Sequence, residues 1–304
     1  MILIKYIFKF ELINTSLGGK QVKPMLKYRG GKTRELLEIK KFIPKYDGKY
    51  IEPFLGGGAL YFDLEPDRAI INDINESLMN FYKGVKDDFK VISSELKDIQ
   101  FIYEKNRKDF EKLKAQYPNE RVKDKNEAIY YKMREYFNGE VETDLHEATI
   151  YYYINKTAYS GMIRYNKSGK YNVPYGRYKN FNTDLITEKH QILLKNAEIY
   201  SLDYLDIFNM AKKDDFIFLD PPYDCIFSDY GNIETKDGFT EEMHRKLAYD
   251  FKNLKVKALM VISKTPLIEE LYGDYIIHEY EKNYAVNIRN RFKAQAKHVL
   301  IANY

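Results

Sequence analysis

Short apolar runs recur along the chain and predict buried strands. The clearest is Phe216-Ile217-Phe218-Leu219, in which four consecutive apolar residues fit a strand buried on both faces. Asp220-Pro221-Pro222-Tyr223 follows and ends the strand, because proline cannot donate to a strand ladder. Further strands are expected over residues 49–52, 69–73, 199–203, 258–263, 276–280 and 299–302. Strands separated by helical sequence predict an α/β fold, in which ligands bind at the carboxyl ends of the strands.

A helical pattern separates the second and third of these strands. From Asn75, apolar residues recur at three- and four-residue steps as far as Ile99, which predicts a helix with one core-facing stripe. Charged helical sequence without a strand-like run then continues to about Glu147. We therefore expect residues 86–189 to form a mostly helical insertion in a sheet-containing domain made of residues 1–85 and 190–304.

Composition sets broad limits. With 304 residues, 44% hydrophobic and 31% charged, the chain can form one large α/β domain plus an insertion. The single cysteine, Cys225, excludes an internal disulfide and fits a reducing, cytoplasmic compartment; we interpret it as a packing residue rather than a nucleophile. The five histidines lack metal-ligand spacing, so no metal is expected. Residues 1–12 are too short and too charged to span a membrane, and we expect an appended strand or arm.

Two glycine-rich segments are candidate ligand-binding turns. Gly56-Gly57-Gly58 separates a predicted strand from a predicted helix and lets backbone approach a ligand, although a tight turn alone would have the same sequence. Asp73 ends the next strand, near the position roughly 20 residues on where an acid binds ribose hydroxyls in nucleotide-binding folds. The other segment, residues 27–33, ends in Gly-Lys-Thr like a P-loop, but Leu26 occupies the position of the first P-loop glycine, which excludes that motif.

The Asp-Pro-Pro-Tyr segment can bind an amino group on a flat ring. Both prolines hold the preceding residue extended, so the Asp220 carboxylate and the Pro221 carbonyl can each accept one amino hydrogen. Tyr223 can stack on the base that carries the amino group. The alternative is a proline-rich strand end without chemistry.

Basic charge is concentrated in residues 151–181. This segment contains six basic residues, eight tyrosines and no acid, a net charge of +6, whereas the whole chain carries +4, so the rest sums to 4 − 6 = −2. Lys167-Ser168-Gly169-Lys170 predicts a hairpin turn. Basic residues interleaved with aromatics are typical of nucleic-acid contacts, and a solvated hairpin is the alternative.

These motifs, in this order, resemble the Dam-like (D12 class) family of DNA adenine-N6 methyltransferases from about Val22 onward. The resemblance implies a Rossmann-like methyltransferase sheet with helices on both faces and a target-recognition insertion that carries a β-hairpin. It implies S-adenosylmethionine as the cofactor, double-stranded DNA as the partner, and no membrane.

The resemblance also implies residue roles. Asp220, Pro221, Pro222 and Tyr223 would be catalytic. The implied cofactor contacts are Tyr28, Lys32, Glu52, Phe54, Gly56, Gly57, Gly58, Asp73, Asp203, Tyr204 and Asp220. The implied DNA contacts are Lys27, Ser160, Met162, Arg164, Asn166, Lys170 and Arg177, with Arg164 reading guanine and Met162 wedged between base pairs. Ser160 stands where the family has Asn at a base contact, so a GATC-like target is expected by analogy only.

The mechanism we expect relies on Asp220 and the Pro221 carbonyl. By accepting both hydrogens of a flipped adenine amino group, they would free its lone pair to attack the sulfonium methyl group. The alternatives are an RNA adenine methyltransferase, although Asp at the head of the motif favours DNA, and a sequence-specific DNA-binding protein with a vestigial cofactor fold. A monomer is expected, with a dimer as the alternative, and a restriction partner is an open question.

Overall fold

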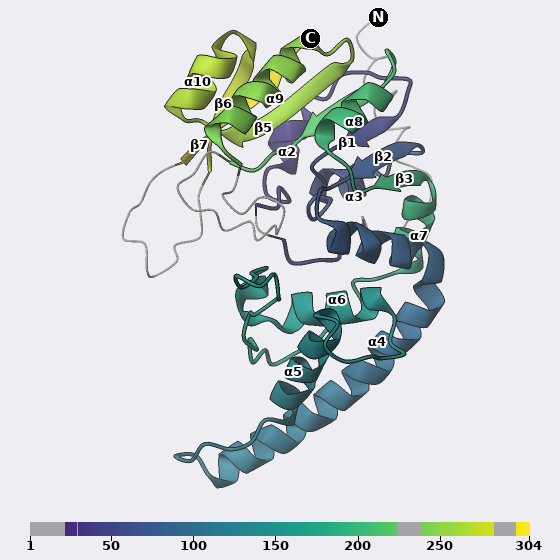
Figure 1. Cartoon of the computed structure of the whole chain (residues 1–304), viewed down its shortest axis with the longest axis vertical. Coiled ribbons are helices and arrows are strands. Elements are labelled where there is room, and N and C mark those ends of the chain that lie inside the picture. Colours follow the sequence, from purple (N-terminus) through teal and green to yellow (C-terminus); the bar gives the residue numbers. More distant parts are fainter. Residues whose placement is uncertain (1–21, 29, 224–238, 283–295) are drawn as a thin grey trace, which may run out of the picture.

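The computed structural model describes residues 22–28, 30–223, 239–282 and 296–304 (Figure 1). The expected N-terminal arm and Cys225 lie outside these ranges. No helix in the described ranges is long and apolar enough to cross a membrane.

The described residues form a seven-stranded mixed sheet with the order β3-β2-β1-β4-β5-β7-β6. The five strands from β3 to β5 in this order are parallel, and β7 is antiparallel to both β5 and β6. The strands are β1 (Tyr50–Glu52), β2 (Ala69–Asn72), β3 (Ala197–Tyr200), β4 (Phe216–Leu219), β5 (Lys257–Ser263), β6 (Ile276–Lys282) and β7 (Ala296–Ala302). The predicted α/β fold is confirmed, and its strand order reverses between β1 and β4.

Helices cover both faces of this sheet. Alternate strand residues divide between two apolar clusters: Phe216 and Phe218 belong to one, whereas Ile217 and Leu219 belong to the other. The first cluster receives residues from α2 (Leu36–Lys40), α3 (Ala59–Leu64), α4 (Glu76–Gln116) and α7 (Glu188–Lys195). The second receives residues from α8 (Tyr204–Met210), α9 (Glu241–Asn253) and α10 (Pro266–Tyr272).

The insertion is built on α4. Asn75 caps this helix by accepting from the Leu78 N–H, and the backbone is non-helical only at Asp88 (φ −118°, ψ 27°). Figure 1 shows α4 running away from the sheet, with α5 (Lys125–Phe137) and α6 (Glu147–Thr157) against it. The apolar cluster on the α4 side of the sheet continues into the insertion, and the boundary that we predict at residue 86 lies next to the kink at Asp88.

The predicted β-hairpin forms as a tight turn without paired strands. Asn166 N–H donates to the Lys170 carbonyl (2.8 Å), but the flanks make only the isolated bridges Tyr165–Tyr171 and Ala158–Tyr175. The reason lies in the aromatic residues, which pack singly into the insertion core: Tyr171 is buried and its hydroxyl donates to the Met162 carbonyl (2.9 Å). The predicted hairpin turn is therefore present, but its flanks form isolated antiparallel bridges and no assigned strands.

Candidate active site

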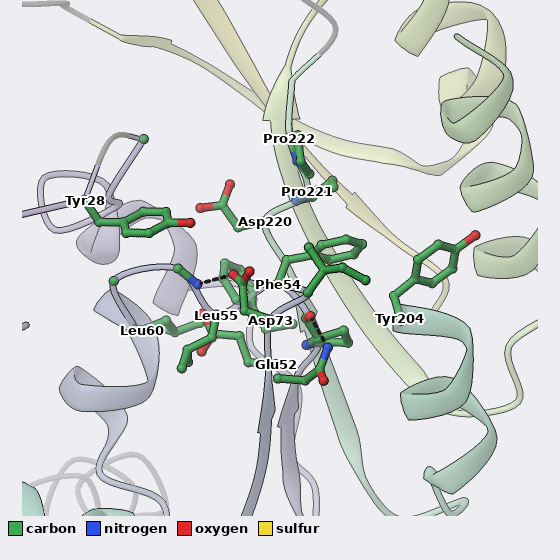
Figure 2. A pocket seen from close by; sticks show the side chains of 18 of the residues that line it. Tyr28, Glu52, Phe54, Leu55, Leu60, Asp73, Tyr204, Asp220, Pro221 and Pro222 are labelled. Carbon is green, nitrogen blue, oxygen red and sulfur yellow. Dashed lines mark hydrogen bonds between the residues drawn. The ribbon is translucent and has the colours of Figure 1, made fainter. Parts of the chain in front are cut away.

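The two predicted motif loops meet where the strand order reverses. β1 pairs with β4, so the glycine loop after β1 and the Asp220–Tyr223 segment after β4 leave the sheet at neighbouring points. A pocket opens between them, as expected for a switch point in an α/β sheet. Figure 2 shows Glu52, Phe54, Asp73, Tyr204 and Asp220 gathered around this pocket.

Local backbone geometry explains the glycine loop. Gly56 and Gly58 have φ of 50° and 65°, which glycine adopts at little cost. A Cβ at Gly56 would also lie 2.7 Å from the Tyr28 ring, which therefore packs directly on the loop. Two hydrogen bonds fix the backbone of the loop at Gly56: its N–H donates to Asp73 Oδ2 (2.9 Å), and its carbonyl accepts from the Tyr82 hydroxyl (2.9 Å).

Asn72 joins the ends of three strands, and sequence reasoning missed it. Its amide nitrogen donates to the carbonyls of Pro53 (2.9 Å) and Leu202 (3.0 Å), and its oxygen accepts from the Leu202 N–H (2.8 Å). The side chain is buried, so these contacts satisfy an amide that would otherwise be costly to enclose. A lone amide at the end of the apolar run 69–71 was the available signal.

Asp220 is held by Lys32. The Lys32 ammonium lies 2.6 Å from each oxygen of the Asp220 carboxylate and donates to the Gly30 carbonyl (2.7 Å). Lys32 is 2% exposed, whereas the Asp220 side chain keeps about 20% of its surface and faces the pocket. Burial raises the pKa of Asp220, and the Lys32 ammonium opposes that shift. The pKa of Asp220 therefore stays above its usual value, and Lys32 limits the rise that burial causes.

Glu52 is a second acid in the same pocket. It is 2% exposed and accepts a hydrogen bond from the Tyr50 hydroxyl (2.6 Å). Burial raises its pKa to about 8; the negative charge of Asp220 adds to this, whereas the Tyr50 hydrogen bond opposes it. At neutral pH Glu52 is thus largely protonated in the described structure, and a cation placed beside it would favour its ionisation.

Aromatic rings form another wall. The ring centroid of Phe54 lies 5.6 Å from that of Tyr204 and 6.3 Å from that of Phe239. Asp203 caps α8 by accepting from the Leu205 N–H (2.9 Å), and its exposed side chain borders the pocket. Three further lining residues, Phe239, Met243 and Lys246, come from α9 and the residues before it, and no motif pointed to them.

Tyr223 is not among the residues that line the pocket. It is 9% exposed, and its ring makes an edge-to-face contact with the His298 ring, with centroids 5.2 Å apart and planes at 87°. The Lys32 ammonium lies 4.9 Å from the centre of the Tyr223 ring. Pro221 and Pro222 do line the pocket, so the structure brings Asp220 and both prolines, but not Tyr223, to its wall.

The predicted DNA contacts lie in or near the insertion. Lys27 joins the segment of residues 27–33 to α6. Its backbone N–H donates to Asn155 Oδ1 (2.9 Å), and its carbonyl accepts from Asn155 Nδ2 (2.9 Å). Its ammonium donates to the Lys156 carbonyl (2.9 Å). The Lys27 ammonium also lies 3.6 Å from the centre of the Tyr178 ring. Ser160 is exposed with φ of 56°, and Met162 is half-buried.

The remaining predicted contacts have partners within the insertion. The exposed Arg164 guanidinium donates to Asn172 Oδ1 (2.8 Å), and Asn166 Oδ1 accepts from the Ser168 and Lys170 N–H groups. Lys170 pairs with Glu140 (2.7 Å), and Arg177 pairs with Glu127 (3.1 Å). Five of the eight tyrosines between residues 151 and 181 are buried: Tyr151, Tyr152, Tyr153, Tyr171 and Tyr175. Most of the aromatic residues that we interpreted as base-stacking groups are therefore core residues.

Comparisons with known proteins agree with this site. The model of the D12 class N6 adenine-specific DNA methyltransferases matches residues 28–286. The chain is 36% identical over 292 residues to the type II methyltransferase M.CviBI of Paramecium bursaria Chlorella virus NC1A, covering 93% of this chain and 100% of the relative. It is 30% identical to the type II methyltransferase M1.LlaDCHI of Lactococcus lactis subsp. cremoris, covering 93% and 96%. It is 31% identical over 204 residues to the DNA adenine methylase of Haemophilus influenzae, covering 66% and 64%.

The chain belongs to the D12 class of N6 adenine-specific DNA methyltransferases, as the sequence motifs predicted. Membership makes it a DNA adenine methyltransferase and implies S-adenosylmethionine as methyl donor. The side chains that line the pocket suit such a ligand chemically. Asp73 and Asp203 can accept from ribose or amino hydrogens, Glu52 can face a cation, and the Phe54 and Tyr204 rings supply an apolar wall. Within the described ranges, no group of three or more His, Cys, Asp or Glu side chains could hold a metal ion.

Proposed function

We propose that this chain methylates the N6 of an adenine that it has turned out of a specific duplex DNA site. The observation that carries the proposal is the position of Asp220, whose carboxylate lines the pocket next to the glycine loop and lies 2.6 Å from the Lys32 ammonium. An acid placed in this way can bind the amino group of a base, and that group is inaccessible while the base is stacked and paired.

In this proposal, Asp220 and the Pro221 carbonyl each accept one hydrogen from the adenine amino group. The amino nitrogen is a weak nucleophile because its lone pair is conjugated with the ring, and two well-placed acceptors reduce that conjugation. Each carboxylate oxygen has more than one acceptor position, so Asp220 can receive adenine while it still receives Lys32. The bound cofactor supplies an electrophilic methyl group on sulfur.

The cofactor would occupy the pocket described above. We assign Asp73 to the ribose, Asp203 and Tyr204 to the edge of the cofactor adenine, and Phe54 with the glycine loop to the methionine part. Tyr28 supports this assignment because its ring closes the pocket over Gly56. Lys32 would act through Asp220.

We assign residues 86–189 to target recognition and residues 1–85 and 190–304 to catalysis. Arg164 supports this division, because it is exposed and its guanidinium is oriented by Asn172, as a base-reading side chain requires. Met162 next to it would enter the duplex. A GATC-like site and action as a monomer belong to this proposal, as does a role beside a restriction enzyme, since two of the relatives are named type II methyltransferases.

Of the two alternatives, a vestigial DNA-binding protein conflicts with membership of an enzyme family whose motifs are intact here. An RNA adenine methyltransferase receives no support from the relatives, which are named as DNA or type II methyltransferases.

The test is to incubate the protein with isotope-labelled S-adenosylmethionine and separate pools of duplex DNA and RNA. The modified positions are then sequenced. We expect label at N6 of adenine within one recurrent DNA sequence. Preferential labelling of RNA, or labelling of adenines in every sequence context, would contradict the proposal.

A further inference from the structure

A buried polar cluster lies behind the Asp220–Tyr223 segment, and the methyl-transfer chemistry described above does not use it. Its centre is Glu35, which is 5% exposed and immediately precedes α2. Glu35 Oε2 lies 2.7 Å from His298 Nδ1 and accepts from the Tyr280 hydroxyl (2.7 Å), and its Oε1 lies 2.6 Å from the Lys282 ammonium.

These partners keep Glu35 charged. Burial alone would raise its pKa, but hydrogen bonds from His298, Lys282 and Tyr280 outweigh burial and lower the pKa to about 2. An ionised carboxylate can only accept, so His298 must carry its hydrogen on Nδ1. The other ring nitrogen of His298 lies 3.3 Å from the Ser263 hydroxyl. The ring of His298, which is fully buried, is therefore held from both sides.

The antiparallel end of the sheet explains why these residues meet. His298 on β7 lies opposite Ser263 on β5 and opposite Tyr280 on β6. Residues directly opposite one another in neighbouring strands project from the same face, so the three side chains form a row. Glu35 approaches that row from the turn that begins at Lys32, because the Glu35 N–H donates to the Lys32 carbonyl (2.7 Å).

This turn contacts both ends of the Asp220–Tyr223 segment. At one end the Lys32 ammonium binds Asp220. At the other end Glu35 holds His298, and the His298 ring makes the edge-to-face contact with the Tyr223 ring. Such contacts between aromatic rings constrain orientation, and Tyr223 has the Lys32 ammonium nearby as well.

We propose that Glu35 and His298 are positioning residues for methyl transfer, which fix Tyr223 and thereby the Asp220–Tyr223 segment. Neither residue would touch DNA or the cofactor. The inference rests on the role proposed above for this segment and assigns its alignment to two residues that the sequence motifs did not identify.

The test uses the full chain and the rate constant of a single turnover, measured with enzyme and S-adenosylmethionine in saturating excess over DNA. This rate constant does not depend on how much of the variant is folded. His298→Asn keeps an N–H close to the position of Nδ1 and so preserves the bond to Glu35, but it removes the ring that contacts Tyr223. We expect the rate constant to fall on the order of 10- to 100-fold, with the Kd values for S-adenosylmethionine and DNA changed less than about threefold.

A double-mutant cycle shows whether His298 acts through Tyr223. In a Tyr223→Ala background, His298→Asn should cause no further loss of rate. An undiminished loss in that background, or a wild-type rate for His298→Asn alone, would overturn the proposal. A wild-type rate for Tyr223→Ala itself would also overturn the proposal, because it would show that the position of Tyr223 does not affect methyl transfer.

His278→Asn is the matched control, because His278 lies on the neighbouring strand β6 and contacts Phe42 and Tyr280 but not Tyr223. Its rate should stay within about twofold of wild type. If His298→Asn fails to fold, Glu35→Gln leaves every ring in place and weakens only the charged bonds. A fall in its rate constant without a change in the two Kd values supports the proposal, and a wild-type rate overturns it.

Discussion

The pocket and the insertion hold their candidate functional groups in different ways. In the pocket, backbone geometry and buried bonds hold each group: Asp73 accepts from Gly56, and Lys32 binds Asp220. In the insertion, the candidate DNA contacts are exposed side chains, and Lys170 and Arg177 already pair with acidic residues. Rigid groups suit a reaction that needs one geometry, whereas paired surface charges must exchange partners before they can bind phosphate. Substitutions in the pocket should therefore act on rate, and those in the insertion on DNA affinity and sequence preference.

The largest effect is expected at Asp220. Asp220→Ala removes an acceptor for the adenine amino group and leaves Lys32 without its carboxylate partner. We expect the single-turnover rate constant to fall by about 10³-fold, while the affinity for DNA stays nearly unchanged. Asp274→Ala, at an exposed acid distant from the pocket residues in sequence, should match wild type in both measurements. A rate for Asp220→Ala close to that of wild type would remove Asp220 from the chemistry.

The second effect concerns Lys32, whose ammonium opposes the rise in the pKa of Asp220 that burial causes. Lys32→Met removes that ammonium, so the pKa of Asp220 should rise further. If the ionised acid is the active form, the acid limb of the pH–rate profile should move to higher pH. The rate at pH 6 should then fall more than the rate at pH 8.5.

Lys40→Met provides the control for this profile. Lys40 pairs with Asp63 at 2.7 Å, eight residues along the chain from Lys32, and neither Lys40 nor Asp63 lines the pocket. Its pH–rate profile should be that of wild type. If Lys32→Met lowered the rate equally at every pH, Lys32 would act by placing Asp220 rather than by keeping it ionised.

The difference between the pocket and the insertion also explains which parts of the structure the sequence could predict. Strand ends, the glycine loop and the Asp-Pro-Pro-Tyr segment were predictable because each depends on local backbone requirements, such as the positive φ at Gly56. The contact of Lys32 with Asp220 joins residues 188 positions apart in the sequence, and no local pattern encodes it. In the insertion, tyrosines next to lysines predicted base stacking, but burial of Tyr152 and its neighbours depends on helix packing that no local pattern encodes.

The third effect, in the insertion, is on sequence preference. Arg164→Ala should cost about 1–3 kcal/mol of discrimination at one base pair of the target, because a bidentate contact to a base would be lost. The measurement is kcat/KM on a set of duplexes that differ at single positions. Arg177→Ala is the contrast: its side chain pairs with Glu127, and we expect a small loss of affinity on every duplex together with a weaker salt dependence. An equal loss on all sequences for Arg164→Ala would make it a phosphate contact.

The smallest effect is on stability and concerns Glu52. Because burial raises its pKa from 4.5 to about 8, the folded protein binds a proton there that the unfolded chain releases between these values. The free energy of unfolding should therefore fall as pH rises from about 4.5 to 8, by the sign of proton linkage.

Glu52→Gln, which is neutral and can still accept from Tyr50, should remove this dependence of stability on pH. We expect it to be about 1–3 kcal/mol more stable than wild type at pH 8 and similar at pH 5, in denaturant unfolding without cofactor. A variant with the pH slope of wild type would show that Glu52 is ionised in the folded chain, so that the pocket carries a full second negative charge beside Asp220 before any cofactor binds.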